Sequence, residues 1–246
     1  MGISADVKLI ENGRRIDGRL PDELRKIRID VGVIPEADGS AFIEWGGNKI
    51  ICGIHGPREC IPKHEASPFH ALLKCRYSMS PFASLEEHGK SGPSRRSVEL
   101  SKVIREVLEN LVITDEFPNT QIDVFIDVLQ ADGGTRTASI VAASVALANA
   151  GIPMRDIAAA VSVGKADGTL IIDLGKLEDN FGQSDMPLAF SARDGRLLLV
   201  QMDGLLTKEE IKQLVEMGEK AARRINAIQV ESLKRFYEKG GEAFKL

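Results

Sequence analysis

The sequence predicts an α+β fold built as one domain over residues 1–246. Three observations support this: strand-like runs separated by glycine-containing turns, three segments with the apolar spacing of helices, and no linker or low-complexity tract between them. Strands arranged in hairpins and mixed with helices are typical of layered α+β domains. The length allows one large domain or two small ones, and an apolar fraction of 43% is ordinary for a globular protein.

The first third of the chain is predicted to contain strands joined by tight turns. Four strand-like segments are expected there: 27–34, 40–45, 49–55 and 71–79. Asp38-Gly39 is a hairpin signal between the first two segments. The polar run 81–94 contains Gly and Pro and is expected to be a loop.

The middle third is predicted to form a helix, a strand and a second helix. Apolar residues recur at helical spacing from Val98 to Leu111, and Ser94 is well placed to cap this helix. The run 122–129 is rich in β-branched and apolar residues, which indicates a strand. The run 137–150 is dominated by alanine and small apolar residues, which indicates a buried helix.

The last third is predicted to return to hairpins before a long helix. Two turns are expected, at Asp167-Gly168 and at Asp194-Gly195. The run 177–187 between these hairpins is expected to be a short loop. Thr207 and Glu210 have the spacing of a capping box, so the long C-terminal helix should begin there.

Charge and cysteine usage exclude several classes of protein. The net charge of −4 argues against a protein that coats nucleic acid with its whole surface, but the basic residues are clumped at 14–19, 62–64 and 94–96, which suits a channel. The three cysteines lack CxxC spacing and the four histidines are scattered, so neither a disulfide framework, a zinc site nor a histidine metal cluster is expected. No apolar run is long enough to span a bilayer and no signal peptide is recognisable, so we expect an intracellular, cytoplasmic protein.

A glycine turn lies between the strand at 122–129 and the alanine-rich helix. In QADGGTRTAS, Gly134 is followed by Thr135 and Arg136, so a hydroxyl group, a guanidinium group and free backbone N–H groups converge at a helix N-terminus. Such a point binds anions. From these residues alone, an anion site and a plain turn are equally good interpretations.

Basic residues in two other places favour the anion interpretation. Arg95 and Arg96 are expected in the first turn of their helix, where the helix dipole disfavours a cation by about 0.3–1 kcal/mol. A solvated surface pair is the simpler reading, but phosphates lying over this helix end would justify two arginines there. Lys63 in the basic loop and Arg76 in the next strand are further candidates for contact with a polyanion.

The run LEDNFGQSDMP (177–187) supplies carboxylates. Glu178, Asp179 and Asp185 lie close together in it, and ordinary turn chemistry explains such residues well. The functional alternative is a general acid, or a pair of carboxylates that holds Mg²⁺.

Taken together, these segments resemble the RNase PH family of phosphate-dependent exoribonucleases. The similarity runs from about Arg14 to the final helix, and three motifs carry it: LQADGGTRTASI, GIPMRDIAAAVSVGKADG and LEDNFGQSDMP. Within that family, GPSRRSVELSKVIRE and VQMDGLLTKEE resemble the catalytic ring subunit of the archaeal exosome.

The resemblance implies the RNase PH fold, with two βαβ-type halves, mixed sheets and packing helices. It implies degradation of single-stranded RNA from the 3′ end by phosphorolysis, with inorganic phosphate as co-substrate and nucleoside diphosphates as products. The reverse reaction would add an untemplated tail. The implied partners are a homologous non-catalytic RNase PH-like subunit, with which three copies form a hexameric ring of three heterodimers, and an RNA-binding cap protein.

The same motifs imply roles for individual residues. Gly134, Thr135 and Arg136 would bind phosphate, whereas Arg95, Arg96, Lys63 and Arg76 would bind RNA. Asp179 would be the catalytic acid and Asp185 its carboxylate neighbour, or the two would hold a Mg²⁺ ion that takes over this role; the sequence does not decide between these.

Three other functions stay open. The chain could be a homohexameric RNase PH that trims tRNA 3′ ends, a non-catalytic RNA-binding ring subunit, or an enzyme with a phosphate loop that does not act on RNA. Activity of the chain purified alone would favour the homohexamer. A requirement for phosphate and the release of diphosphates would support phosphorolysis.

Overall fold

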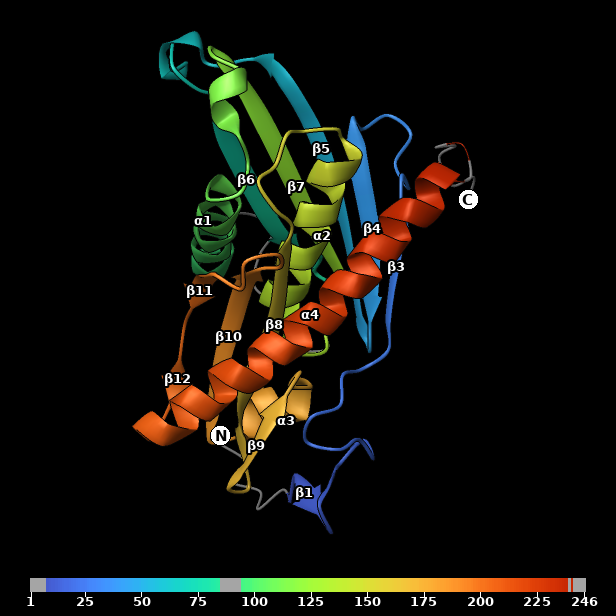
Figure 1. The fold of residues 1–246 in the computed structure, drawn as a ribbon, viewed down its shortest axis with the longest axis vertical. Helices are drawn as coiled ribbons and strands as arrows, with labels where there is room; N and C mark the ends of the chain where they lie inside the picture. The colour runs from blue at the N-terminus through green and yellow to red at the C-terminus, as the bar shows by residue number, and fades with distance from the viewer. Residues whose placement is uncertain (1–7, 85–93, 239, 241–246) are drawn as a thin grey trace.

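Two five-stranded sheets and the helices around them make up the fold (Figure 1). The computed structural model describes residues 8–84, 94–238 and 240. The first sheet has the order β3-β4-β5-β7-β6. Its strands are β3 (Ile27–Val31), β4 (Gly39–Trp45), β5 (Asn48–Glu59), β6 (Leu72–Met79) and β7 (Thr120–Gln130).

The first sheet is mixed. β6 and β7 pair in parallel, and the other neighbours pair antiparallel. Helix α1 (Arg95–Glu109) connects the parallel pair, which requires such a crossover, so this half contains a βαβ unit. Two short 3₁₀ helices, η1 (Lys63–Glu65) and η2 (Thr114–Glu116), lie in its connections.

The second sheet has the order β11-β10-β8-β9, and β12 also pairs with β10. All of its pairings are antiparallel. Its strands are β8 (Ala158–Ala166), β9 (Thr169–Ile172), β10 (Ser184–Ser191), β11 (Leu197–Val200) and β12 (Asp203–Gly204). β1 (Ile10–Glu11) and β2 (Arg14–Arg15) form a separate two-stranded ribbon.

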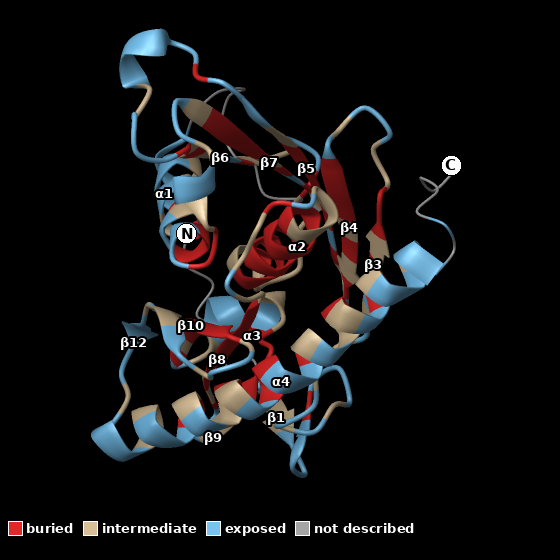
Figure 2. Ribbon diagram, turned by 45° about the horizontal axis from the view of Figure 1, so that its top comes forward, coloured by how far each residue is buried: buried red, intermediate tan, exposed pale blue. Residues whose placement is uncertain are grey.

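Helices α2 (Thr135–Asn149) and α4 (Lys208–Glu238) connect the two sheets. α2 contacts strands of both sheets, and most of its residues are buried because its small side chains let the strands come close (Figure 2). A Cβ atom on Gly39 of β4 would lie only 2.3 Å from the backbone nitrogen of Ala150. α4 runs diagonally past both sheets and buries one face against β3 and β8 (Figures 1 and 2). One cluster of buried apolar residues extends through both halves.

The predicted helix starts and most predicted turns are confirmed. The hydroxyl group of Ser94 accepts a hydrogen bond from the backbone N–H of Ser97 at 3.0 Å, which caps α1. Thr207 and Glu210 form the expected capping box before α4, with bonds of 3.2 and 2.8 Å. The turns predicted at 167–168 and 194–195 join antiparallel strand pairs, β8 with β9 and β10 with β11.

Three local predictions are wrong. The hairpin of β3 and β4 is present, but its turn is wrongly placed, because Gly39 is the first residue of β4 and the connection from β3 occupies residues 32–38. Val98 is 60% exposed, and Leu100 faces the core in its place. The run 177–187 is not a loop throughout, because it contains most of α3 (Lys176–Phe181), a fourth α-helix in the described part of the chain.

Buried contacts explain why α3 forms in so short a segment. The Glu178 carboxylate accepts a hydrogen bond from the N–H of Gly175 at 2.8 Å, which closes the first turn. The same carboxylate pairs with Arg15, whose side chain is fully buried. Helix formation here therefore depends on a residue far away in the sequence.

Among the described residues, no helix combines the length and the apolar character needed to cross a bilayer.

Candidate active site

The glycine turn, residues 132–134, joins β7 to α2. Gly133 and Gly134 both have left-handed backbone angles, with φ of 73° and 70°. A Cβ atom on Gly133 would lie 2.7 Å from the backbone of Gly175 and Lys176, so this position has no room for a side chain. Gly134 is the N-cap residue of α2, and the free N–H groups of the helix begin immediately after it.

A cavity of about 360 Å³ lies at this helix end. It collects residues from α1, the glycine turn, the start of α2, the second sheet with the segment between β11 and β12, and α3. They are Arg96, Glu99, Gly134, Thr135, Arg136, Thr137, Ser162, Asp179, Asp185, Pro187, Gln201, Met202 and Asp203. Two guanidinium groups and four carboxyl groups therefore face the same cavity: those of Arg96 and Arg136, and those of Glu99, Asp179, Asp185 and Asp203.

The structure brings together six of the nine residues that the sequence singles out for the site. They are Arg96, Gly134, Thr135, Arg136, Asp179 and Asp185. Arg95 is exposed beside Arg96 but does not line the cavity. Lys63 lies in η1, 82% exposed, and pairs with Glu59 at 2.6 Å, while Arg76 is exposed on β6. These last two lie outside the cavity.

Arg136 is held by polar partners on both sides. Its Nη1 donates to Oε1 of Gln201 at 2.5 Å, and its Nη2 lies 3.9 Å from the Glu99 carboxylate. Its Nε atom is buried without a hydrogen-bond partner. The guanidinium group is therefore oriented at the cavity wall with a donor still to be satisfied.

Thr135 lies deep in the same wall. It is 4% exposed, and its hydroxyl oxygen accepts a hydrogen bond from the Tyr77 hydroxyl at 3.1 Å. Because Tyr77 supplies the proton of that bond, the Thr135 hydroxyl keeps its own proton to donate. Thr135 and Arg136 can thus both donate to one anion at the α2 N-terminus.

The two aspartates form a coupled acidic pair. Burial raises the pKa of Asp179, and the nearby Arg96 and Arg136 oppose this rise. Burial and the charge of Asp179 raise the pKa of Asp185 from 3.8 to about 7. The pair can hold a proton at neutral pH, which ordinary surface aspartates do not. Glu178 is excluded from this group because it is buried in its ion pair with Arg15.

The pair also has the chemistry of a cation site. Oδ1 of Asp185 is buried and has no hydrogen-bond partner, so it is free to bind a cation. In the described ranges, no group of three or more His, Cys, Asp or Glu side chains is arranged around a single point. Asp179 and Asp185 thus fit a Mg²⁺ ion that keeps several water or substrate ligands.

Local sequence reasoning missed four lining residues that complete the site. They are Glu99, Ser162, Gln201 and Asp203. Glu99 follows Arg96 by three residues on α1, a spacing that could have indicated it. Gln201 and Asp203 reach the cavity only because β12 pairs with β10, where Asp203 lies opposite Asp185. No local pattern reveals that register.

The cavity places two arginines and the α2 N-terminus beside two carboxyl groups, an arrangement that can bind anions and transfer a proton. Residues 23–153 match the 3′ exoribonuclease family, domain 1, and residues 156–221 match domain 2 of the same family. The chain therefore belongs to the 3′ exoribonuclease (RNase PH) family, whose enzymes degrade RNA from the 3′ end by phosphorolysis.

Individual relatives agree with this membership. The chain is 55% identical to the exosome complex component Rrp41 of Thermococcus gammatolerans over 240 residues, which cover 97% of this chain and 96% of that protein. It is 49% identical to the Rrp41 of Thermoplasma acidophilum over 233 residues, or 94% of each chain.

Solved structures show the same fold. Rice Rrp46 superposes with a TM-score of 0.81 at 25% identity, covering 89% of this chain and 100% of that one. A chain of the Archaeoglobus fulgidus exosome with RNA bound to the active site superposes with a TM-score of 0.76 at 25% identity, covering 87% and 92%.

Proposed function

We propose that this cavity is where inorganic phosphate attacks the last phosphodiester of an RNA and releases a nucleoside diphosphate. The observation that carries the proposal is the meeting of Arg96, Arg136 and the glycine turn with Asp179 and Asp185. Two anionic reactants repel each other, and the arginines together with the α2 N-terminus offset that repulsion. Phosphate takes the place that water has in a hydrolase.

In this proposal, phosphate binds between the glycine turn and Arg136. The backbone N–H groups that follow Gly134, the Thr135 hydroxyl and the guanidinium group donate hydrogen bonds to it. Phosphate is already an anionic nucleophile, so the site needs no strong base. Its main contribution is to hold the phosphate oxygen close to, and in line with, the scissile phosphorus–oxygen bond.

Asp179 is the proposed acid. As the new phosphorus–oxygen bond forms, the bond to the 3′-oxygen of the preceding nucleotide breaks, and the Asp179 carboxyl gives its proton to that oxygen. The raised pKa of Asp179, which its burial causes, supports this role. In the alternative, Asp179 and Asp185 would both be ionised and hold Mg²⁺, which would stabilise negative charge on the leaving oxygen in place of the proton.

The remaining basic residues are proposed to hold RNA. Arg96 inside the cavity and Arg95 next to it would contact the phosphates at the 3′ end. Lys63 and Arg76 lie outside the cavity and are exposed. We therefore assign them to contacts with the part of the RNA that has not yet entered the cavity.

We further propose that the chain folds as one domain and acts as the catalytic subunit of a cytoplasmic archaeal-type exosome. Three copies would alternate with a homologous non-catalytic subunit in a hexameric ring, and an RNA-binding protein would cap it. The similarity to Rrp41 proteins supports the assembly, and the buried cluster that extends through both halves supports the single domain.

The test is to incubate RNA with the protein, alone and with the partner subunit, with phosphate, with sulfate or with neither. We expect shortening from the 3′ end only with phosphate, and diphosphates as products. Sulfate has a similar shape and charge but is a poor nucleophile, so it should not support shortening. Nucleoside diphosphates and Mg²⁺ without phosphate should lengthen the RNA. Monophosphates released without phosphate would refute phosphorolysis, and full activity of the chain alone as a hexamer would favour the homohexameric alternative.

A further inference from the structure

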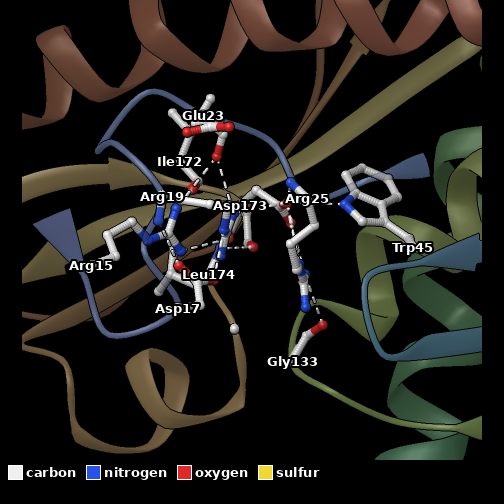
Figure 3. A network of polar contacts seen from close by, with 12 residues as sticks. Arg15, Asp17, Arg19, Glu23, Arg25, Trp45, Gly133, Ile172, Asp173 and Leu174 are labelled. Atoms are coloured by element: carbon white, nitrogen blue, oxygen red, sulfur yellow. Dashed lines mark hydrogen bonds and ion pairs between the residues drawn. The ribbon is translucent and has the colours of Figure 1, made fainter.

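A buried ion pair next to the cavity joins the glycine turn to the segment that leads into α3 (Figure 3). The Arg25 guanidinium group donates to the backbone carbonyl oxygens of Asp132 and, at 3.3 Å, of Gly133. On its other side it pairs with Asp173, with 2.7 Å between Nη2 and Oδ1. Neither Arg25 nor Asp173 lines the cavity.

The carbonyl groups of the glycine turn need these donors. Gly134 of the turn lines the cavity, and the half-buried carbonyl groups of Asp132 and Gly133 need partners elsewhere. Arg25 supplies two such bonds, and Nδ2 of Asn48 supplies a third to Gly133 at 2.6 Å. The position of the turn is therefore set by the side chains of Arg25 and Asn48, neither of which lines the cavity.

Asp173 fixes the other end of the connection. It is buried, its φ is 55°, and its Oδ2 accepts hydrogen bonds from the backbone N–H of Arg25 at 2.6 Å and from Nε1 of Trp45 at 3.0 Å. Burial raises the pKa of Asp173, but Arg25 outweighs this, so the pKa is lowered and the group stays a carboxylate.

Asp173 is also close in sequence to the proposed acid. Leu174 and Gly175 follow it and lead into α3, which carries Asp179. The backbone N–H of Leu174 donates to Oγ of Ser162, a lining residue, at 3.2 Å. A displacement of Asp173 would therefore move both the start of α3 and one wall of the cavity.

We propose that Arg25 and Asp173 are positioning residues that hold the glycine turn in register with α3, so that bound phosphate is aligned with Asp179. The inference rests on the proposed function. It extends that function by assigning a role in phosphate binding to two residues that do not touch phosphate. Arg25 precedes β3 of the first sheet and Asp173 follows β9 of the second, so the pair sets the geometry between the two halves of the site.

Two substitutions test the assignment. Asp173→Asn keeps the shape and tolerates the left-handed backbone, but its amide group cannot accept both bonds from Arg25. Arg25→Lys keeps the charge next to Asp173, but one ammonium group cannot also bridge the two carbonyl oxygens. We expect each variant to raise the KM for phosphate about tenfold or more. The Kd for RNA should change less than twofold.

The matched control is Asp123→Asn on β7. Asp123 is also a buried carboxylate, and it pairs with Arg58 at 2.6 Å. It precedes the glycine turn by nine residues along β7, about 30 Å of extended chain. We expect this variant to lose stability without any change in the KM for phosphate.

The measurements are phosphate titrations of RNA degradation by the assembly that proves active, RNA binding without phosphate, and thermal unfolding. An unchanged KM for phosphate in both site variants would overturn the inference, as would an equal rise in Asp123→Asn. If wild-type degradation did not depend on phosphate at all, the proposed function would fail first and the inference with it. The wild-type titration separates these two failures.

Discussion

Asp185→Asn is expected to increase stability and to reduce activity. The pKa of Asp185 is raised from 3.8 to about 7, because the carboxyl group is buried and lies near Asp179. The folded protein therefore keeps a proton that the unfolded chain releases above about pH 4. The contribution of Asp185 to the free energy of unfolding is therefore fully present below about pH 4, and it is lost as the pH rises from about 4 to about 7.

The size of this loss follows from the pKa. One pH unit is equivalent to roughly 1.4 kcal/mol, so the rise from 3.8 to about 7 corresponds to about 4 kcal/mol, of which about 3 kcal/mol is lost above pH 5. Asn has the same shape but no charge to bury, so the variant escapes this loss. For a chain of this size about 1 kcal/mol shifts Tm by about 2–4 °C, so the Tm of the variant should gain roughly 5–10 °C on wild type between pH 5 and pH 8.

The assay is thermal unfolding of wild type and variant in the same assembled state at pH 5 and pH 8, without phosphate, Mg²⁺ or RNA. The control is Asp127→Asn, an exposed acid on β7 that should not change the pH dependence. RNA degradation by Asp185→Asn should fall about 100-fold or more, because the variant loses a carboxylate that we propose takes part in catalysis. If wild type and Asp185→Asn lost stability in parallel between pH 5 and pH 8, the assignment of a raised pKa to Asp185 would be wrong.

Three further substitutions test other parts of the site. Asp179→Ala should abolish degradation while RNA binding survives, measured by product release and by RNA titration; full activity would remove Asp179 from the acid role. Arg96→Ala should weaken RNA binding and degradation more than Arg95→Ala, since only Arg96 lines the cavity, and equal effects would contradict this difference. Gly133→Ala should destabilise the fold by about 2 kcal/mol or more in denaturant unfolding and raise the KM for phosphate, because its Cβ atom would meet backbone at 2.7 Å. Gly168→Ala, which has a similar φ and open space around it, should cost only about 1 kcal/mol, and an equal cost would rule out the clash.

Features with a local cause could be predicted from the sequence. The glycine turn, the cap at Ser94 and the capping box at Thr207 each depend on residues a few positions apart, and the structure has all three. The convergence of Arg96 with Arg136 was also expected, because two arginine-bearing helix starts suggested one shared anion.

Features that depend on residues far apart in the sequence could not be predicted from it. α3 depends on Arg15, which is 163 residues from its partner Glu178, so 177–187 looks like a loop when only neighbouring residues are considered. The same holds for Gln201, which reaches Arg136 through the register of the second sheet. Asp179 and Asp185 were selected by the family resemblance, since their local pattern also suits plain turn residues.

The cavity is built from segments far apart in the sequence, so it is complete only late in synthesis. The glycine turn follows β7, whereas Asp179 and Asp185 come from α3 and β10, which are synthesised later. A nascent chain that has left the ribosome only through α2 contains the glycine turn but neither carboxylate, and it lacks Asp173, which pairs with Arg25 beside that turn. Because synthesis runs from the N-terminus, the proposed phosphorolysis can begin only after the C-terminal half has emerged and docked.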